Sequence, residues 1–329
     1  MSVPIWPSSP GQTVSASAGG LDFKALAEQY GKLSVRELVS TTSGLALAQL
    51  VAARAAIQLA TLVDARRFCR VDMVPPGGGR VYHFQFVQIP ATFEAEKNEA
   101  ADLNATDVNL SDQQATLKMY AVRTNISDLA QRQAAVNLAE VVGIAHGNAL
   151  NRGMNADIYD VLDDSTTCVV TKGTANDGNV TGYDFNDIMY LKGAIEAQKG
   201  RADTFVTFPY ASGGTNNGKV GFYPFVMQNI TAVQFTTALT SYVATGQISE
   251  LFGLKLYVDD VYKPSNVAAN GARYASMCVG GEAVGWAQAE DIISEIQRWA
   301  PFIGFFIVSH VTGDAVTVKE PHTGLIKHA

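Results

Sequence analysis

The most regular apolar pattern in the chain lies in its N-terminal part and has helical spacing. Ala46, Leu50, Ala53, Ile57 and Ala60 recur at intervals of four and three residues. The opposite side carries Arg54, Gln58 and Thr61. Because residues three and four apart share one face of a helix, this spacing predicts an amphipathic helix with its apolar face toward a core.

A longer helix is predicted over residues 127–162, where apolar residues persist at helical intervals. Ser127 and Asp128 offer an N-cap hydroxyl and a first-turn carboxylate. Three glycines have low helix propensity and count against one unbroken rod: Gly143, Gly147 and Gly153. A third helix is predicted to begin after Asp184 as N-cap and to end at Gly200 in the left-handed conformation.

Between the first two helices the pattern changes to alternation, which is typical of strands. Residues 80–89 place Tyr82, Phe84 and Phe86 on one face, and a second strand-like run covers 115–126. We expect the two runs to pair as a hairpin. The connection at 90–114 holds six carboxylates and one base, Lys97, and is too long for a plain loop in a compact domain. The tip of the hairpin is therefore predicted to extend away from its own domain and rest on another surface.

The rest of the chain mixes both kinds of element, which predicts an α+β fold. Strands are expected at 203–208, 254–258 and 274–279, a helix at 229–243, and a final hairpin turn at 312–314. The first twenty residues are rich in Ser, Gly and Pro and are predicted to form an arm that a neighbouring subunit orders.

Composition narrows the class of protein. The 329 residues carry a net charge of −7 with only 17% charged residues, which argues against a general nucleic-acid coat and hints at a subunit of an assembly. No stretch has the composition of a signal peptide or a membrane span, so we expect no membrane partner. Cys69, Cys168 and Cys278 are far apart and are predicted to be free thiols.

Candidate chemistry is sparse. Gly77, Gly78, Gly79 and Arg80 lack the Lys-Ser/Thr ending of a phosphate-binding loop, so a plain turn is expected. The five histidines lack the helical spacing of a metal pair, and no serine or cysteine lies in a catalytic signature. The sequence therefore predicts no catalytic residue, no metal and no cofactor.

The order of the segments resembles the major capsid proteins of tailed bacteriophages, with the Hong Kong 97-like fold. A polar arm, a basic amphipathic helix, a long acidic hairpin, one long helix and a mixed α+β unit follow one another. The phrases Arg123-Thr-Asn-Ile-Ser-Asp-Leu129 and Gly246-Gln-Ile-Ser-Glu-Leu-Phe-Gly-Leu254 look like capsid segments. The resemblance implies that the hairpin is the extended loop lying over an adjacent subunit, and that the long helix is the spine of a peripheral domain.

The resemblance also implies a division of the chain. The expected parts are an N-terminal arm (1–45), an amphipathic helix and connection (46–74), an extended hairpin loop (75–126), a peripheral domain (127–200 and 281–329) and an axial domain (201–280). No long scaffolding segment precedes the arm, so scaffolding is expected from a separate protein or not at all.

The function implied is a shell protein that forms pentamers and hexamers around double-stranded DNA, assembled in the host cytoplasm and located in the virion. Portal, scaffolding and decoration proteins are further implied partners. An encapsulin-type compartment is the alternative within the same fold, and a soluble oligomeric enzyme is the alternative outside it.

Two sets of residues are predicted to make contacts. The loop should touch the neighbouring subunit through Phe93, Glu94, Glu96, Glu99, Leu103, Val108 and Leu110. A basic surface for that loop or for DNA is expected from Arg54, Arg66, Arg67, Arg70 and Arg80. For Arg66, Arg67 and Arg70 two interpretations stay open, since these three could equally pair with neighbouring carboxylates.

Overall fold

The computed structural model describes residues 14–15, 51–58, 64–88, 109–127, 138–172, 183–209, 221–229, 250–262, 266–267, 271–299 and 304–328. The predicted arm apart from Val14 and Ser15, the hairpin tip at 89–108, and the predicted helix beyond Asn229 lie outside the described residues.

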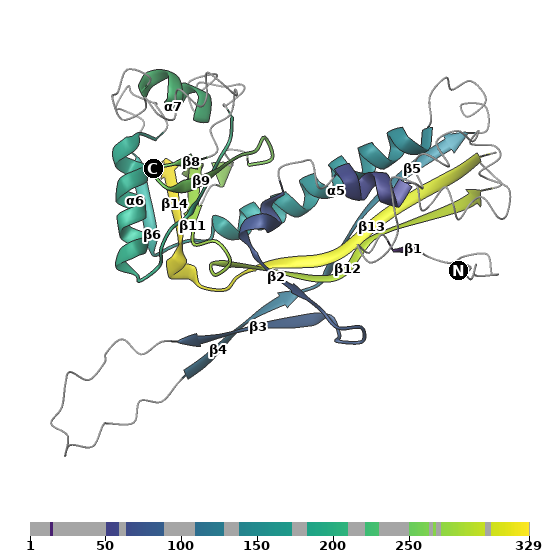
Figure 1. Cartoon of the computed structure of the whole chain (residues 1–329), viewed down its shortest axis with the longest axis horizontal. Helices are drawn as coiled ribbons and strands as arrows, with labels where there is room; N and C mark the ends of the chain where they lie inside the picture. The colour runs from purple at the N-terminus through teal and green to yellow at the C-terminus, as the bar shows by residue number, and fades with distance from the viewer. Residues whose placement is uncertain are drawn as a thin grey trace, which may run out of the picture.

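A five-stranded sheet forms the elongated part of the molecule (Figure 1). Its strands run in the order β1 (Val14–Ser15), β12 (Val284–Trp299), β13 (Gly304–Thr317) and β5 (Lys118–Ser127). The neighbours in this order are antiparallel, and β2 (Arg70–Met73) adds to β12 in parallel.

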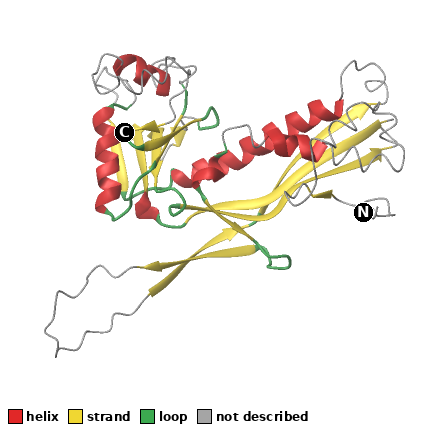
Figure 2. Cartoon of the chain, viewed as in Figure 1, coloured by secondary structure: helices red, strands yellow, loops and turns green. Residues whose placement is uncertain are grey.

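The helix α5 (Leu138–Leu162) lies along one face of this sheet and is unbroken (Figure 2). Its glycines admit the helix at 51–58, because a Cβ on Gly143 would lie 2.6 Å from Arg54 Cβ and one on Gly147 2.7 Å from the Ala55 carbonyl oxygen. Ser127 is the last residue of β5, and α5 is described from Leu138.

The predicted amphipathic helix has its faces in a different orientation. Helix 51–58 exists, but its buried residues are Val51, Ala52, Ala53 and Ala55, whereas Ile57 is 40% exposed. The prediction was wrong because close contact with α5 depends on small residues, which a count of apolar positions does not weigh.

A seven-stranded sheet forms the second part of the molecule. Its main order is β6 (Cys168–Lys172), β14 (Thr323–His328), β11 (Gly271–Cys278), β7 (Thr204–Thr207), β9 (Leu254–Val258) and β8 (Glu250–Leu251), and β10 (Asn266–Val267) pairs with β11. Strands from 168–172 and 323–328, which the sequence-based division assigned to the peripheral domain, thus share a sheet with the predicted axial strands.

Two helices accompany this sheet, α6 (Phe185–Ala197) and α7 (Phe222–Asn229). The Asp184 cap is confirmed, since Asp184 and Asp187 form a capping box. The left-handed residue after α6 is Lys199, not Gly200. Position 200 favours glycine because of packing, since a Cβ there would lie 2.9 Å from the His322 ring.

One continuous core joins the two sheets. Its members come from α5, from the five-stranded sheet and from the seven-stranded sheet, as with Tyr159, Trp286 and Phe205. Of two short 3-10 helices, η1 (Ala65–Phe68) directly precedes β2, and η5 (Glu320–His322) lies between β13 and β14. Arg273 is buried on β11 and pairs with Asp160 at 3.3 Å and with Asp163, which fixes the end of α5.

The hairpin consists of β3 (Val81–Gln88) and β4 (Asn109–Thr116), paired from Val81 opposite Thr116 to Gln88 opposite Asn109. The predicted strand at 115–126 therefore exists in large part, but its predicted pairing with 80–89 was wrong. That run divides at Leu117, and its larger part is β5, which pairs with β13.

The predicted turn at 312–314 was also wrong. These residues continue β13, which pairs with β12 throughout. Gly313 is required by packing, because a Cβ there would lie 2.5 Å from the Trp286 ring, and Asp314 accepts a hydrogen bond from the Thr116 amide.

Candidate interaction surfaces

The hairpin leaves the body on the face of the five-stranded sheet opposite α5 (Figure 1). Its apolar anchor is Phe84, which is fully buried. The ring of Phe84 lies against Gly285 of β12, where a Cβ would approach it to 2.7 Å. Phe84 belongs to a small apolar cluster separate from the main core, with Val74, Ala115, Leu117, Ala287 and Val318.

Polar contacts hold the same root. Arg70 pairs with Asp72 at 3.0 Å, lies over the Phe84 ring and donates a hydrogen bond to the Gln85 carbonyl at 3.1 Å. Tyr82 donates to Asp72 at 3.3 Å, and burial together with the nearby Asp72 carboxylate raises the pKa of Tyr82. The hairpin thus has a fixed attachment.

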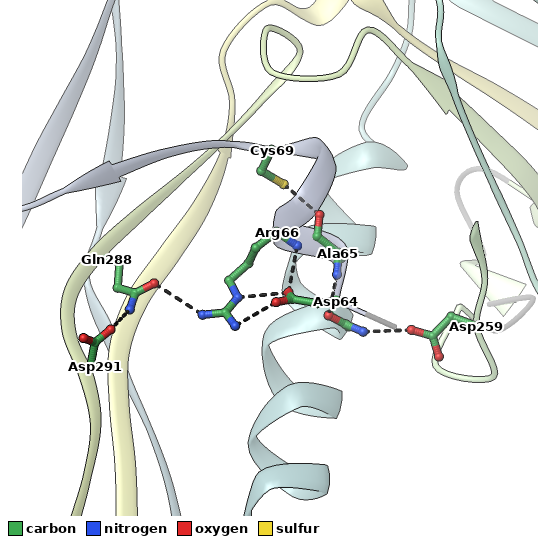
Figure 3. Close-up of polar contacts among 8 residues, drawn as sticks. Asp64, Ala65, Arg66, Cys69, Asp259, Gln288 and Asp291 are labelled. Carbon is green, nitrogen blue, oxygen red and sulfur yellow. Dashed lines mark hydrogen bonds and ion pairs between the residues drawn. The ribbon is translucent and has the colours of Figure 1, made fainter. Parts of the chain in front are cut away.

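A buried polar network joins η1, α5 and the loop after β9 (Figure 3). The Ala65 amide donates to Asn155 at 3.0 Å, and Asn155 in turn donates to Asp259 at 2.8 Å. Asp259 also accepts from Tyr159 at 2.8 Å, and burial raises the pKa of the Asp259 carboxyl. This network holds the two sheets in one orientation.

A second buried network lies between α5 and the five-stranded sheet. His146 contacts Thr124 through Nε2 at 2.8 Å and Ser309 through Nδ1 at 2.7 Å, and Ser309 contacts Ser294 at 2.8 Å. Burial lowers the pKa of His146. The imidazole is a structural link, since it and both serines are buried.

The opposite side of that sheet presents outward residues from two strands, which we call the β5–β13 face. On β13 the buried positions alternate with half-buried ones, and the outward residues of β5 match them in register. The β5–β13 face consists of Met119, Ala121, Arg123, Asn125, Phe306, Val308, His310 and Thr312.

Comparison with known proteins gives matches at the level of structure alone. No family model and no curated protein matches the sequence. The capsid of cyanophage P-SCSP1u matches with a TM-score of 0.59 at 15% identity, covering 82% of this chain and 88% of that one. The mature capsid of bacteriophage PhiM1 matches at 0.55 and 10% identity (80% and 86% covered), and the capsid of a native GTA particle at 0.53 and 14% identity (81% and 90% covered).

The chain has the Hong Kong 97-like capsid fold. At these identities the likeness establishes the fold alone. The predicted α+β class and the resemblance drawn from the order of segments are confirmed.

Within this capsid fold, the predicted loop contacts lie in the tip. Phe93, Glu94, Glu96, Glu99, Leu103 and Val108 fall outside the described residues. Leu110 is in β4, opposite Val87.

The predicted basic residues do not form one surface. Arg54 pairs with Glu140 of α5 at 2.6 Å, Arg66 forms two contacts with Asp64 at 2.9 and 2.8 Å, and Arg70 is held at the hairpin root. Arg67 on η1 and Arg80 before β3 are exposed. For Arg66 and Arg70 the structure thus shows the carboxylate pairing that the sequence left open, and Arg54 is paired as well.

The β5–β13 face and both buried networks were missed by sequence analysis. The alternation within 118–127 could have indicated that this strand has an outward face. The sequence does not show which residues of β13 lie beside it. In the described part of the chain, no helix is long and apolar enough to cross a membrane, and no three His, Cys, Asp or Glu side chains gather as a metal site. The three cysteines are free and buried.

Proposed function

We propose that this chain is the major capsid protein of a tailed double-stranded DNA virus, and that it assembles as pentamers and hexamers into an icosahedral shell around the genome. The observation that carries the proposal is the hairpin, whose described strands β3 and β4 project from a body of capsid fold and pack on it through the small cluster around Phe84. A two-stranded ribbon is marginally stable alone, so its far part needs a second surface.

A neighbouring copy supplies that surface. Repeated head-to-tail contacts close into rings when each subunit is rotated relative to the next. The contact residues on the loop are Phe93, Glu94, Glu96, Glu99, Leu103, Val108 and Leu110. Their acidic and apolar character suits a patch with cations and exposed apolar atoms.

We assign the parts of the chain by sheet. The peripheral domain comprises the five-stranded sheet with α5, the axial domain comprises the seven-stranded sheet with α6 and α7, and the extended loop runs from β3 to β4. Residues 1–45 remain the N-terminal arm.

The enclosed partner is DNA, held without sequence preference and located with the protein in the virion after assembly in the host cytoplasm. Of the predicted basic residues, the exposed Arg67 and Arg80 are the candidates for phosphate or loop contact. Portal, scaffolding and decoration proteins are proposed as further partners on the basis of the fold.

Electron microscopy of the purified protein tests the proposal. Closed shells are expected, and discrete small oligomers at all concentrations would favour the alternative of a soluble oligomeric enzyme. Nuclease-protected DNA inside native particles is expected for a virus. An enclosed enzyme in place of DNA would favour the encapsulin-type compartment.

A further inference from the structure

The junction between the hairpin and the five-stranded sheet lies between Thr116, the last residue of β4, and Lys118, the first residue of β5. The two strands run in different directions from this point (Figure 1). The ladder between β13 and β5 ends with the pair Gly313 and Lys118. The next residue of β13 is Asp314, whose side chain accepts a hydrogen bond from the Thr116 amide at 2.9 Å. A side chain of the body thus holds the hairpin where the ladder ends.

Asp314 is a buried carboxylate, and its counter-ion is Lys118. Asp314 is 7% exposed, and the Lys118 ammonium lies 3.0 Å from its Oδ1 atom. An exposed ion pair is worth little, but a buried charge that loses its partner is strongly unfavourable. The hydrogen bond to Asp314 raises the pKa of Lys118, so the ammonium stays charged at neutral pH. The position of this lysine is therefore tied to the junction.

The same lysine joins the junction to α5. Its ammonium lies 3.3 Å from Oδ2 of Asp157 on α5, and that oxygen also accepts a hydrogen bond from Tyr120 of β5. Asp314 faces the hairpin side of the sheet, since it pairs in register with Ala287 of the small apolar cluster. Because β5 is the last strand of the sheet, Lys118 reaches around the edge and connects the hairpin side with the helix on the other face.

We propose that Lys118 is a positioning residue: by bridging Asp314 and Asp157 it fixes the direction in which the hairpin leaves the body. The apolar cluster around Phe84 attaches the hairpin, but apolar contacts are non-directional, so they do not set an angle. The ion pairs act on one side of the junction, between groups of fixed position on β13 and α5. They therefore supply the directional part of the attachment.

A fixed direction has a consequence for association. A loop that is already held in one direction loses less conformational freedom when it binds, so less of the binding free energy is spent on ordering it. Removal of the bridge should therefore raise the protein concentration at which subunits associate. This last step rests on the proposed capsid function, whereas the direction of the hairpin is a property of the single subunit.

Distances between two spin labels on dissociated subunits measure the direction. The labels are attached through Gln113→Cys on β4 and Ala149→Cys on α5, both exposed positions, and the native cysteines are buried. With Lys118 unchanged we expect one narrow distance distribution. Lys118→Met keeps the aliphatic stem without the ammonium and should make the distribution about twice as wide, because the hairpin samples more directions. Lys118→Arg keeps the charge and should restore the narrow distribution.

Two controls separate positioning from folding. The matched variant is Lys255→Met, because the Lys255 side chain is 63% exposed, against 58% for Lys118, and pairs with Asp203 at 3.8 Å in the other sheet. It should leave the hairpin distribution narrow. A second pair of labels within the body, at Ala149→Cys and Glu196→Cys, should give the same distribution with Lys118 or Met at position 118. If both distributions widened, the substitution would loosen the whole body and the positioning role would be overturned.

Light scattering measures the concentration at which shells appear. Lys118→Met without labels should raise it about fivefold or more, and Lys255→Met should not. An unchanged hairpin distribution in Lys118→Met would overturn the positioning role and leave the capsid function standing. A widened distribution in a protein that forms no shells would keep the positioning role and remove the capsid function. A widened distribution with an unchanged onset of shell formation would overturn the link between hairpin direction and assembly.

Discussion

The hairpin root offers a sharp test of how the loop is held. In Phe84→Ala a fully buried ring is removed from the small cluster that contains Val74 and Ala115. Truncation of a buried Phe typically costs about 3–5 kcal/mol, and the Arg70 contact over the ring adds about 0.5–1 kcal/mol. Because this cluster is separate from the main core, we expect the loss to appear as local opening of the hairpin.

Hydrogen exchange on dissociated subunits measures that opening. At about 1.4 kcal/mol for each factor of ten, a loss of 3 kcal/mol accelerates exchange of the amides in 81–88 and 109–116 by about 100-fold or more. Amides of β7 at 204–207, in the other sheet, should keep their protection. The variant should also fail to form shells, since the loop no longer leaves the body at a fixed angle.

Two glycine variants sharpen the test. Gly285→Ala keeps the ring but places a Cβ at 2.7 Å from it, so it should open the same amides. Gly193→Ala on α6 meets nothing within 4 Å and should be neutral or stabilising by about 0.5–1 kcal/mol. If Phe84→Ala lowered protection equally in 204–207 and in the hairpin, the root would be part of the global fold and the reasoning would be refuted.

Three further predictions concern the body. Gly147→Ala should lower the free energy of unfolding by about 1–3 kcal/mol in denaturant titration, since its Cβ meets the Ala55 carbonyl, whereas Gly153→Ala should not. Asp184→Ala should cost about 0.5–2 kcal/mol through the lost cap, and Asp184→Asn, which retains an acceptor, should cost less. His146 has a lowered folded-state pKa, so the unfolded state takes up a proton first as pH falls; stability should be level above about pH 6.5 and decline below it by up to about 1.4 kcal/mol per unit. A His146→Gln variant with the same acid slope would contradict this assignment.

Sequence patterns correctly predicted the elements that are determined by residues close together in the chain. The capping box at Asp184, the long α5 and the alternation of Tyr82, Phe84 and Phe86 all follow from residues close together in the sequence. The buried strand at 204–207 lies within the predicted range of 203–208, a short run with Phe205, Val206 and Phe208 that is followed by Pro209.

The wrong predictions concern strands whose partners lie far away in the sequence. The sequence favoured a turn at Thr312–Asp314, because nothing local shows that Trp286, twenty-seven residues before Gly313, lies over that glycine. The same holds for the hairpin, where β4 is mostly polar and β5 holds more apolar and β-branched residues, so the more strand-like run was chosen as the partner of β3.

The buried apolar residues form two separate clusters, one in the body and one at the root of the hairpin. The main cluster draws on both sheets and on α5, and the Asn155–Asp259 network crosses between the sheets, so the body should behave as one rigid unit. The hairpin depends on a separate cluster of six buried residues, in which the body contributes Ala287 of β12 together with Val74 and Val318, which directly follow β2 and β13. Substitutions in that small cluster can therefore redirect or release the loop while the body stays folded.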